Sequence, residues 1–366
     1  AFADGALATP SITNTGDLNT GVYFPAADTV GVVAGGVEQF RFGSNPIPGA
    51  RKNLVLNGDF DVWQRGTAFS TGNEYTADAW LWAGTAGSGA VSRQTFTPGQ
   101  TDVPNNPTYF WRATVGTGDT AVNLLTSIED VGHGAGVPVT VSLWAKASET
   151  TGWLDGASGP TLVQRYGTGG STATRVELDG TFQSQTITTS WQKFVATATP
   201  ASISGKTVGA GNFLELALQT DADLASSATL DIAQVQVEYG SVATDFDDGG
   251  DFGTILQKCH RYFERRNYED ASDTIGAGVY TTATVSTIVI HFSTKRVQPT
   301  ITFEAASNYR MIDQNNAVRV ASGIAAGAIS HTTTTLNFTT PTAPLGGAYA
   351  TVVNATTYID ISAELQ

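Results

Sequence analysis

Short stretches of alternating apolar and polar residues, interrupted by glycine, run through most of this 366-residue chain. In VPVTVSLWAKAS, Val139, Val141 and Leu143 alternate with Thr140 and Ser142, and FLELALQT and QVQVEYG repeat the pattern. A period of two is typical of a β-strand with one buried face, because successive side chains point to opposite sides of a sheet. Together with 40 glycines, this pattern predicts an all-β fold of short strands joined by tight turns.

One stretch departs from the strand pattern. In TILQKCHRYFERRN, apolar residues recur at helical spacing from Ile255 to Phe263, while basic residues occupy other positions. Thr254 follows an acidic, glycine-broken stretch and has a side chain suited to an N-cap. We therefore predict one short helix that begins at Thr254.

Two stretches rich in turn-forming residues divide the chain. GSNPIPGARK, with Pro46 and Pro48, ends an N-terminal segment, and DFDDGGDFG ends a central block. We predict three units: an N-terminal β segment (1–48), a central β block (49–250), and the helix with a C-terminal β domain (251–366). The chain begins without Met, its only Met being Met311, so we expect a fragment or a processed product.

Charge and composition exclude several classes of partner. A net charge of -14 and a pI near 4.6 would repel a phosphate backbone, so no nucleic-acid partner is expected. No apolar stretch approaches the roughly 20 residues that span a bilayer, so no membrane insertion is expected. The single Cys excludes an intramolecular disulfide and a Cys-based zinc site.

The N-terminal segment carries three short motifs in order, namely Pro10-Ser11, then Gly16-Asp17 with Thr20-Gly21, then Gly35-Gly36 with Glu38 and Arg41. This segment resembles the short fibre segments of tailed-bacteriophage tail proteins. From NLVLNGDFDVWQRG through YTADAW to CHRYFERR, roughly residues 53–266, the chain is similar to the carbohydrate-binding-module-like domain of phage tail fibre and receptor-binding proteins. The resemblance implies a jelly-roll β-sandwich in an adhesive fibre. Ala79 stands where that family more often has Arg, which puts any role of that Arg in doubt here.

The resemblance also implies a metal site. In carbohydrate-binding sandwiches of this type, the Asn-Gly-Asp-Phe start lies near a calcium ion whose other ligands include an acid on the last strand. A structural calcium would then be held by Asp59 and Asp231, with no other cofactor. The alternative is that Asn57-Gly58 is only a turn and Asp59 a solvated cap. The acidic residues of 245–251 lack the ligand spacing of an EF-hand and predict an acidic linker.

All seven Trp residues lie between Trp63 and Trp191, in the central block. Aromatic faces stack on the apolar faces of sugar rings, which is how a binding module could use them. Trp153 lies among turn formers in SETTGWLDGASG, and Trp82 and Trp111 are intermediate cases. These three are the candidates for sugar stacking, and packing against a loop or a neighbouring chain is the alternative.

Motifs of catalysis are missing from the sequence. There is no Gly-x-Ser-x-Gly elbow, no complete phosphate loop and no metal spacing among the four His residues. We therefore predict a non-enzymatic virion fibre protein that attaches to host-surface glycans. The alternatives are a structural fibre shaft or decoration protein, and a polysaccharide depolymerase.

The N-terminal segment predicts the assembly. Residues 5–42 fall below the roughly 40 residues at which an isolated segment can bury enough surface to fold alone. The fibre segments that it resembles wrap three copies about one axis. We therefore expect a homotrimer, with other virion tail proteins as further partners.

Overall fold

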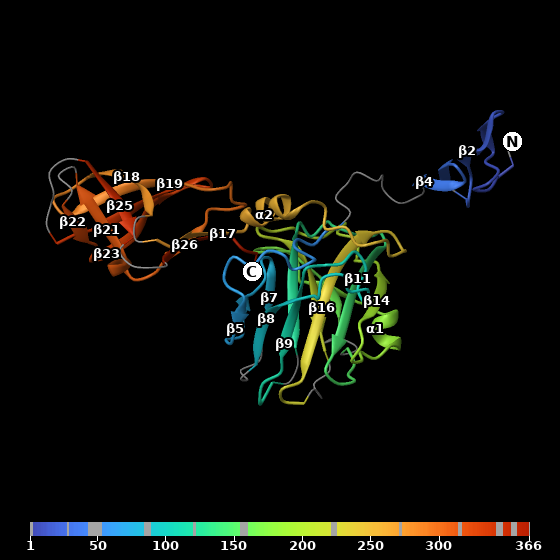
Figure 1. The fold of residues 1–366 in the computed structure, drawn as a ribbon, viewed down its shortest axis with the longest axis horizontal. Helices are drawn as coiled ribbons and strands as arrows, with labels where there is room; N and C mark the ends of the chain where they lie inside the picture. The colour runs from blue at the N-terminus through green and yellow to red at the C-terminus, as the bar shows by residue number, and fades with distance from the viewer. Residues whose placement is uncertain are drawn as a thin grey trace.

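The computed structural model describes residues 3–27, 29–42, 53–83, 89–119, 122–153, 160–220, 225–270, 273–313, 317–341, 347–352 and 357–365. Over these ranges the strands form five sheets, all of them antiparallel, and the all-β prediction is confirmed. Figure 1 shows a small N-terminal sheet, a central sandwich and an elongated C-terminal block.

The N-terminal sheet has the order β1-β2-β3-β4 and very little core of its own. Its strands are β1 (Ile12–Asn14), β2 (Asp17–Tyr23), β3 (Val30–Ala34) and β4 (Val37–Phe42). Gly35 and Gly36 join the last two strands with φ of 61° and 78°, a left-handed conformation that side chains disfavour. Tyr23 and Val33 are buried, whereas Leu18 is 62% exposed.

The central block is a jelly-roll β-sandwich of two six-stranded sheets, with the orders β13-β12-β15-β10-β7-β6 and β14-β11-β16-β9-β8-β5. The chain switches repeatedly between the two sheets. The strands are β5 (Ala68–Phe69), β6 (Glu74–Tyr75), β7 (Trp80–Trp82), β8 (Ala90–Thr95), β9 (Tyr109–Thr114), β10 (Asn123–Glu129), β11 (Val139–Ala147), β12 (Thr161–Arg165), β13 (Thr174–Glu177), β14 (Gln192–Ala198), β15 (Phe213–Gln219) and β16 (Thr229–Tyr239), and helix α1 is Thr181–Ser184.

The alternating stretches of the sequence form strands β11, β15 and β16, with their apolar sides in the core between the sheets. Trp144 breaks the alternation of β11 at a register shift against β16, where Gln234 has φ of 48°. This bulge lets Trp144 pack with Phe110 and Trp191 in a separate small cluster.

The predicted acidic linker is held against the sandwich. The amide of Asp247 donates to Oε1 of Gln236 at 2.9 Å, and Oδ1 of Asp248 accepts from the amide of Gly58, also at 2.9 Å. Gln236 lies on the polar side of β16 and is buried because this stretch covers it. The acidic residues therefore extend the sandwich instead of separating two units.

Helix α2 (Phe252–His260) is shorter than predicted. Strand β17 (Phe263–Tyr268) follows it, because those residues pair along their whole length with strand β26 of the C-terminal block. The N-cap is Asp251 and not Thr254, since the Asp251 side chain accepts from the Thr254 amide at 2.8 Å. The helix packs its apolar face on Val62 of the sandwich. None of the helices in the described ranges is long and apolar enough to cross a membrane.

The C-terminal block combines a three-stranded sheet, β17-β26-β20, with a seven-stranded sheet, β22-β21-β25-β18-β19-β24-β23. One core, which includes Ile288, Tyr309 and Ile359, joins the two sheets. The remaining strands are β18 (Thr274–Tyr280), β19 (Val285–His291), β20 (Thr300–Phe303), β21 (Tyr309–Asp313), β22 (Val318–Val320), β23 (Gly323–Ile329), β24 (Thr333–Thr339), β25 (Gly347–Val352) and β26 (Thr357–Ser362), with the 3₁₀ turn η2 at Ala306–Asn308.

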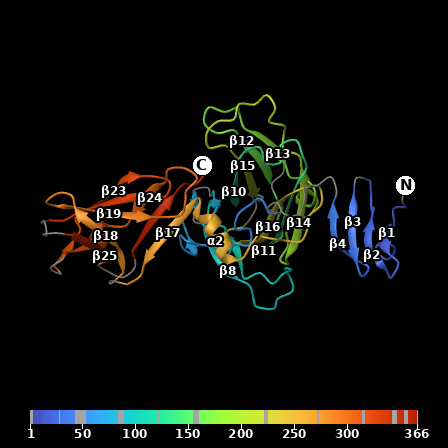
Figure 2. The ribbon, with the colours of Figure 1, turned by 90° about the horizontal axis from the view of Figure 1, so that it is seen from above.

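The last described residues return to the sandwich. Nη2 of Arg65 lies 2.7 Å from Oε1 of Glu364, and both side chains are largely buried. The Tyr75 hydroxyl donates to the carbonyl of Leu365 at 2.7 Å, and the Leu365 side chain packs with Phe213. Seen from above, α2 lies between the sandwich and the C-terminal block (Figure 2). The joint between the two blocks is therefore both apolar and ion-paired.

Candidate functional site

The three Trp residues expected to stack on sugar all lie in the core of the sandwich. Trp82 is 5%, Trp111 0% and Trp153 6% exposed. Trp111 donates from Nε1 to Oγ1 of Thr76 at 3.1 Å, which satisfies its one polar atom. An indole can stack on a sugar only if one of its faces is open to solvent. The sugar-stacking prediction is therefore wrong for Trp82, Trp111 and Trp153.

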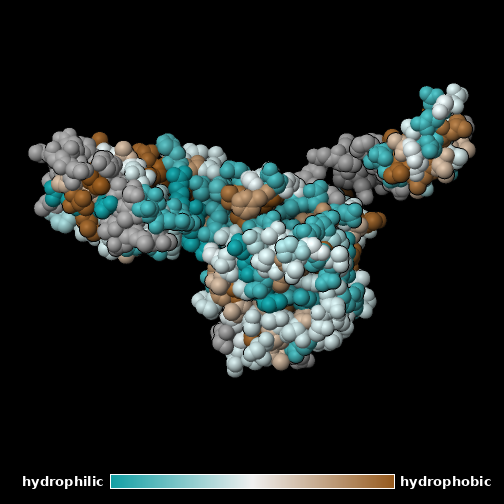
Figure 3. Space-filling model, in the orientation of Figure 1, coloured by the Kyte–Doolittle hydropathy of each residue, from teal (hydrophilic) through white to brown (hydrophobic). Residues whose placement is uncertain are grey.

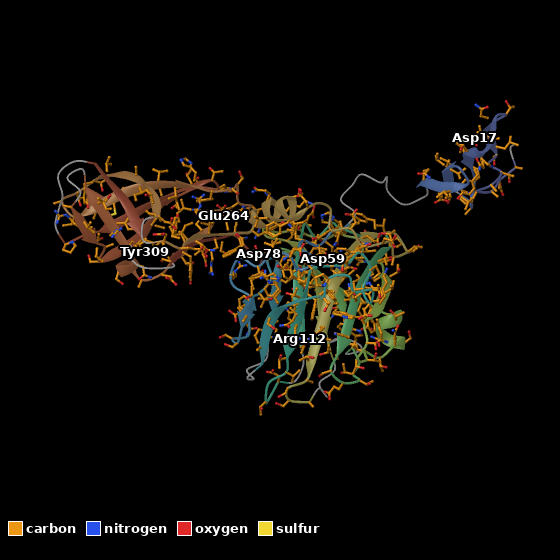
Figure 4. The ribbon with its side chains drawn as sticks, in the orientation of Figure 1. Asp17, Asp59, Asp78, Arg112, Glu264 and Tyr309 are labelled. Atoms are coloured by element: carbon orange, nitrogen blue, oxygen red, sulfur yellow. The ribbon has the colours of Figure 1, made fainter. Side chains whose placement is uncertain are left out.

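The two carboxylates expected to share a calcium ion are not brought together. Asp231 is buried under Arg112, whose Nε and Nη2 donate to its two carboxylate oxygens at 2.6 and 2.7 Å. This bidentate pair neutralises Asp231 without a metal. Figure 4 shows Arg112 well down the sandwich from Asp59. The pairing of Asp59 with Asp231 is wrong.

Asp59 lies in a different environment. Its Oδ1 is buried without a hydrogen-bond partner among the described residues. Burial, followed by the nearby charges of Asp61 and Asp248, raises the pKa of Asp59 to about 8. Nowhere in the described ranges do three His, Cys, Asp or Glu side chains gather as a metal site would require. A structural calcium that does not involve Asp231 stays a prediction.

The largest cleft among the described residues, about 670 Å³, lies beside α2. The loop 61–64, strands β8 and β9 and the exposed side of α2 line it. In Figure 3 the apolar side chains of α2 form a brown patch above the sandwich. The residues that give the cleft its chemistry are Asp61, Trp63, Arg93, Tyr109, Phe252 and His260.

The Asn-Gly-Asp stretch builds one wall of this cleft. Asn57 is fully buried, its Oδ1 accepts from the Val62 amide at 2.9 Å, and its Nδ2 donates to the carbonyls of Val62 and Asp78. A Cβ on Gly58 would lie 2.2 Å from the carbonyl oxygen of Val235, so only glycine fits against the last strand. The stretch is therefore a closed turn, and it places Asp61 at the cleft.

Two polar side chains of the cleft lack partners. Oδ1 of Asp61 is buried without a hydrogen bond among the described residues, and burial raises the pKa of this carboxyl, while Arg93 opposes the shift. The guanidinium of Arg93 lies 4.2 Å from the centre of the Tyr109 ring. No hydrogen bond or ion pair joins this guanidinium to any described side chain. The cleft thus offers an acceptor and a planar donor to a ligand.

The remaining polar groups of the cleft are already engaged or neutral. Arg265 donates to both oxygens of Asp360, at 2.7 and 2.6 Å, and to the carbonyl of Arg65. Burial lowers the pKa of His260, the charge of Glu264 opposes this, and the charge of Lys295 adds to it, so the imidazole is neutral near pH 7. Arg93 is therefore the cation of the cleft that a ligand can reach.

The sequence did not indicate this cleft. Its residues come from a loop, two strands and a helix that are up to about 200 positions apart in the chain. One signal was present: the Asn-Gly-Asp stretch stood out, although its role was read as a metal site. The aromatic residue with an open face is Phe252, 56% exposed, whereas indoles had drawn the attention.

Comparisons with known proteins add likenesses at low identity. No family model matches the chain, and no curated protein matches it. The enzymatically active domain of tailspike protein 4 of bacteriophage CBA120 is similar over 51% of this chain and 21% of that one, with 14% identity and a TM-score of 0.30. This chain therefore spans about a fifth of that tailspike chain.

Two xylan-utilisation modules of Paenibacillus barcinonensis give similar values. The CBM22-1 xylan-binding domain of Xyn10C matches over 48% of this chain and 94% of its own, with 16% identity and a TM-score of 0.27. The tandem CBM22-1-CBM22-2 domain of the same protein matches over 87% of this chain and 100% of its own, with 12% identity and a TM-score of 0.29. Because these TM-scores lie below 0.5, function is argued here from the residues of this chain.

Proposed function

We propose that this chain is a non-catalytic fibre protein of a phage virion, outside the cell, whose β-sandwich attaches to host-surface glycans. The observation that carries the proposal is the cleft beside α2, in which aromatic rings and unpartnered polar groups line one space. The fibre and virion parts of the proposal rest on the sequence motifs of the N-terminal segment and the central block.

The chemistry of the cleft suits a sugar. A pyranose ring has an apolar face and an edge of hydroxyl groups, so its site needs an aromatic surface beside hydrogen-bonding groups. Phe252 offers the aromatic surface because it is 56% exposed on the rim of the cleft. Asp61 can accept from sugar hydroxyls, and Arg93 can donate to sugar oxygens.

The cleft favours binding over hydrolysis. Glycoside hydrolysis ordinarily uses two carboxyl groups on either side of the scissile bond. Among the described residues that line the cleft, Asp61 is the one carboxylate. This count supports the adhesin over a depolymerase.

The N-terminal sheet supports a homotrimer that joins other virion tail proteins. Leu7, Ile12, Leu18 and Val37 are between 42% and 62% exposed on a sheet with almost no core. Three copies around one axis would cover these side chains and close the open sheet edges. The trimer remains part of the proposal.

A purely structural fibre shaft or decoration protein is the second candidate. The seven-stranded sheet of the C-terminal block exposes Val279 and Val289 at 59% and 52% on its outer face. Exposed apolar side chains on a sheet face are suited to contacts with other proteins. A chain that only made such contacts would bind no glycan.

A glycan array probed with the full chain separates the two candidates. We expect binding to at least one class of bacterial surface glycan, and Phe252→Ala should weaken it about tenfold, since truncating a contact aromatic typically costs over 1 kcal/mol. Val242→Ala is the control, because Val242 is 68% exposed and does not line the cleft. Absence of binding across host surface polysaccharides, or equal binding by Phe252→Ala, would contradict the proposal.

A further inference from the structure

Arg93 lies in an unusual environment for a partly buried guanidinium. It projects from β8 at the cleft, and its plane is held against the ring of Tyr109 on the neighbouring strand β9. Stacking fixes the position of the guanidinium and leaves its N–H groups, which point along the plane, able to donate. None of them is used by another described side chain.

Asp61 is the nearby carboxylate that could have neutralised Arg93. The charge of Arg93 does act on Asp61, yet no ion pair joins the two side chains, and Oδ1 of Asp61 stays without a partner. Both are described, so the open donor and the open acceptor are features of the same cleft. A ligand that fills the cleft can satisfy both only if it carries hydroxyl donors and an acceptor of negative charge.

We propose that the cleft beside α2 selects an acidic sugar, one whose carboxylate binds Arg93 and whose ring hydroxyls donate to Asp61. This inference rests on the proposed function, because it names the class of glycan for the same site. A planar carboxylate matches the fork of a guanidinium with two parallel hydrogen bonds. The ring of the same sugar would lie toward Phe252 at the rim.

The other charges of the molecule sharpen this selection. The net charge of -14 repels anions in general, so an anionic glycan needs a specific cation to stay bound. Arg265, the other arginine of the cleft, is committed to Asp360 by two hydrogen bonds. Arg93 is therefore the group on which discrimination between an acidic and a neutral sugar depends.

The test compares glycans that differ only in their carboxyl group. The full chain is applied to an array of glycans that contain uronic or sialic acid, to the same glycans after carboxyl reduction to neutral alcohols, and to sulfated glycans. We expect the acidic forms to bind about 10- to 100-fold more tightly than their reduced counterparts, the range of one charge-assisted hydrogen bond.

Variants assign this preference to Arg93. Arg93→Gln should remove the preference, and Arg93→Lys, which keeps the charge but loses the planar fork, should retain only part of it. Arg175→Gln is the matched control, because Arg175 is exposed on β13 and does not line the cleft. Thermal melting of each variant establishes that it folds, so that lost binding reports on the site.

The outcomes separate the inference from the proposed function. Equal binding of acidic and reduced glycans, an undiminished preference in Arg93→Gln, or a preference for sulfated over carboxylated glycans would overturn the acidic-sugar inference and leave glycan attachment standing. If no glycan of any class binds, the proposed function fails, and the inference fails with it.

Discussion

Asn53 and Asn57 hold the start of the sandwich against its last strand. Oδ1 of Asn53 accepts from the amide of Val237 at 3.0 Å, and its Nδ2 donates to the carbonyl of Val235 at 2.9 Å. Asn57 does the same for the loop that reaches Asp61. Both amides are completely buried and hydrogen-bonded, so this stretch is rigid without a metal.

Asp59 makes the stability of the folded chain depend on pH. Its pKa is raised to about 8 by burial and by the charges of Asp61 and Asp248, against about 4 in an unfolded chain. Between these values the folded state keeps a proton that the unfolded state has lost, so the free energy of unfolding should fall as pH rises from about 4 to 8. Asp59→Asn should flatten this slope, measured by urea unfolding at several pH values.

Two controls accompany that measurement. Asp102→Asn makes the same change at an exposed position and should leave the slope unaltered. Running each sample with calcium and with chelator tests the calcium prediction, because an ion that binds only the folded state raises the melting temperature. A slope that persists in Asp59→Asn would contradict the assignment to Asp59, and a chelator effect lost in that variant would place a calcium ion at this carboxylate.

At the scale of elements, Trp153 joins α1 and β14 to the rest of the sandwich. Its ring lies edge-on to Phe182 of α1 and Phe194 of β14, with centroid distances of 5.3 and 5.6 Å. Trp153→Ala should lower the free energy of unfolding by about 3–5 kcal/mol, as expected when a buried aromatic is removed. Chemical denaturation measures the loss, and glycan binding of the folded variant should be unchanged. A stable variant with weakened binding would return Trp153 to the sugar site.

The strands were predictable from sequence where one face of a sheet is buried. Alternation located β11, β15 and β16 because Val141, Leu216 and Val237 must all point into one core. The end of α2 was not predictable, since Phe263 leaves the helical pattern to pair with Ser362, about a hundred residues later. Local periodicity carries no information on such a distant partner.

The candidate site was less predictable for the same reason. Indoles near turns were expected to be open to solvent, but Trp153 is covered by Phe182 and Phe194, which the sequence alone does not place beside it. Arg112 likewise reaches Asp231 across neighbouring strands, and this contact removes the acid from any metal site. The cleft beside α2 exists only once the helix has docked on Val62.

At the scale of the whole molecule, the joint between the sandwich and the C-terminal block holds the walls of the cleft. Arg65 binds Glu364, and Arg265 binds both Asp360 and the carbonyl of Arg65. These largely buried contacts fix α2 and β17 against the loop that carries Asp61. A fibre that transmits load through such a joint could present its glycan site in a constant geometry.

Hydrogen exchange of the full chain with and without a host surface polysaccharide tests the central claim most directly. A ligand in the cleft should slow exchange of the backbone amides of residues 61–66, of the start of β9 and of α2, since it excludes solvent there. Exchange on the outer faces of β12 and β15 should stay unchanged. Protection of those faces or of the seven-stranded sheet, with none at the cleft, would contradict the account.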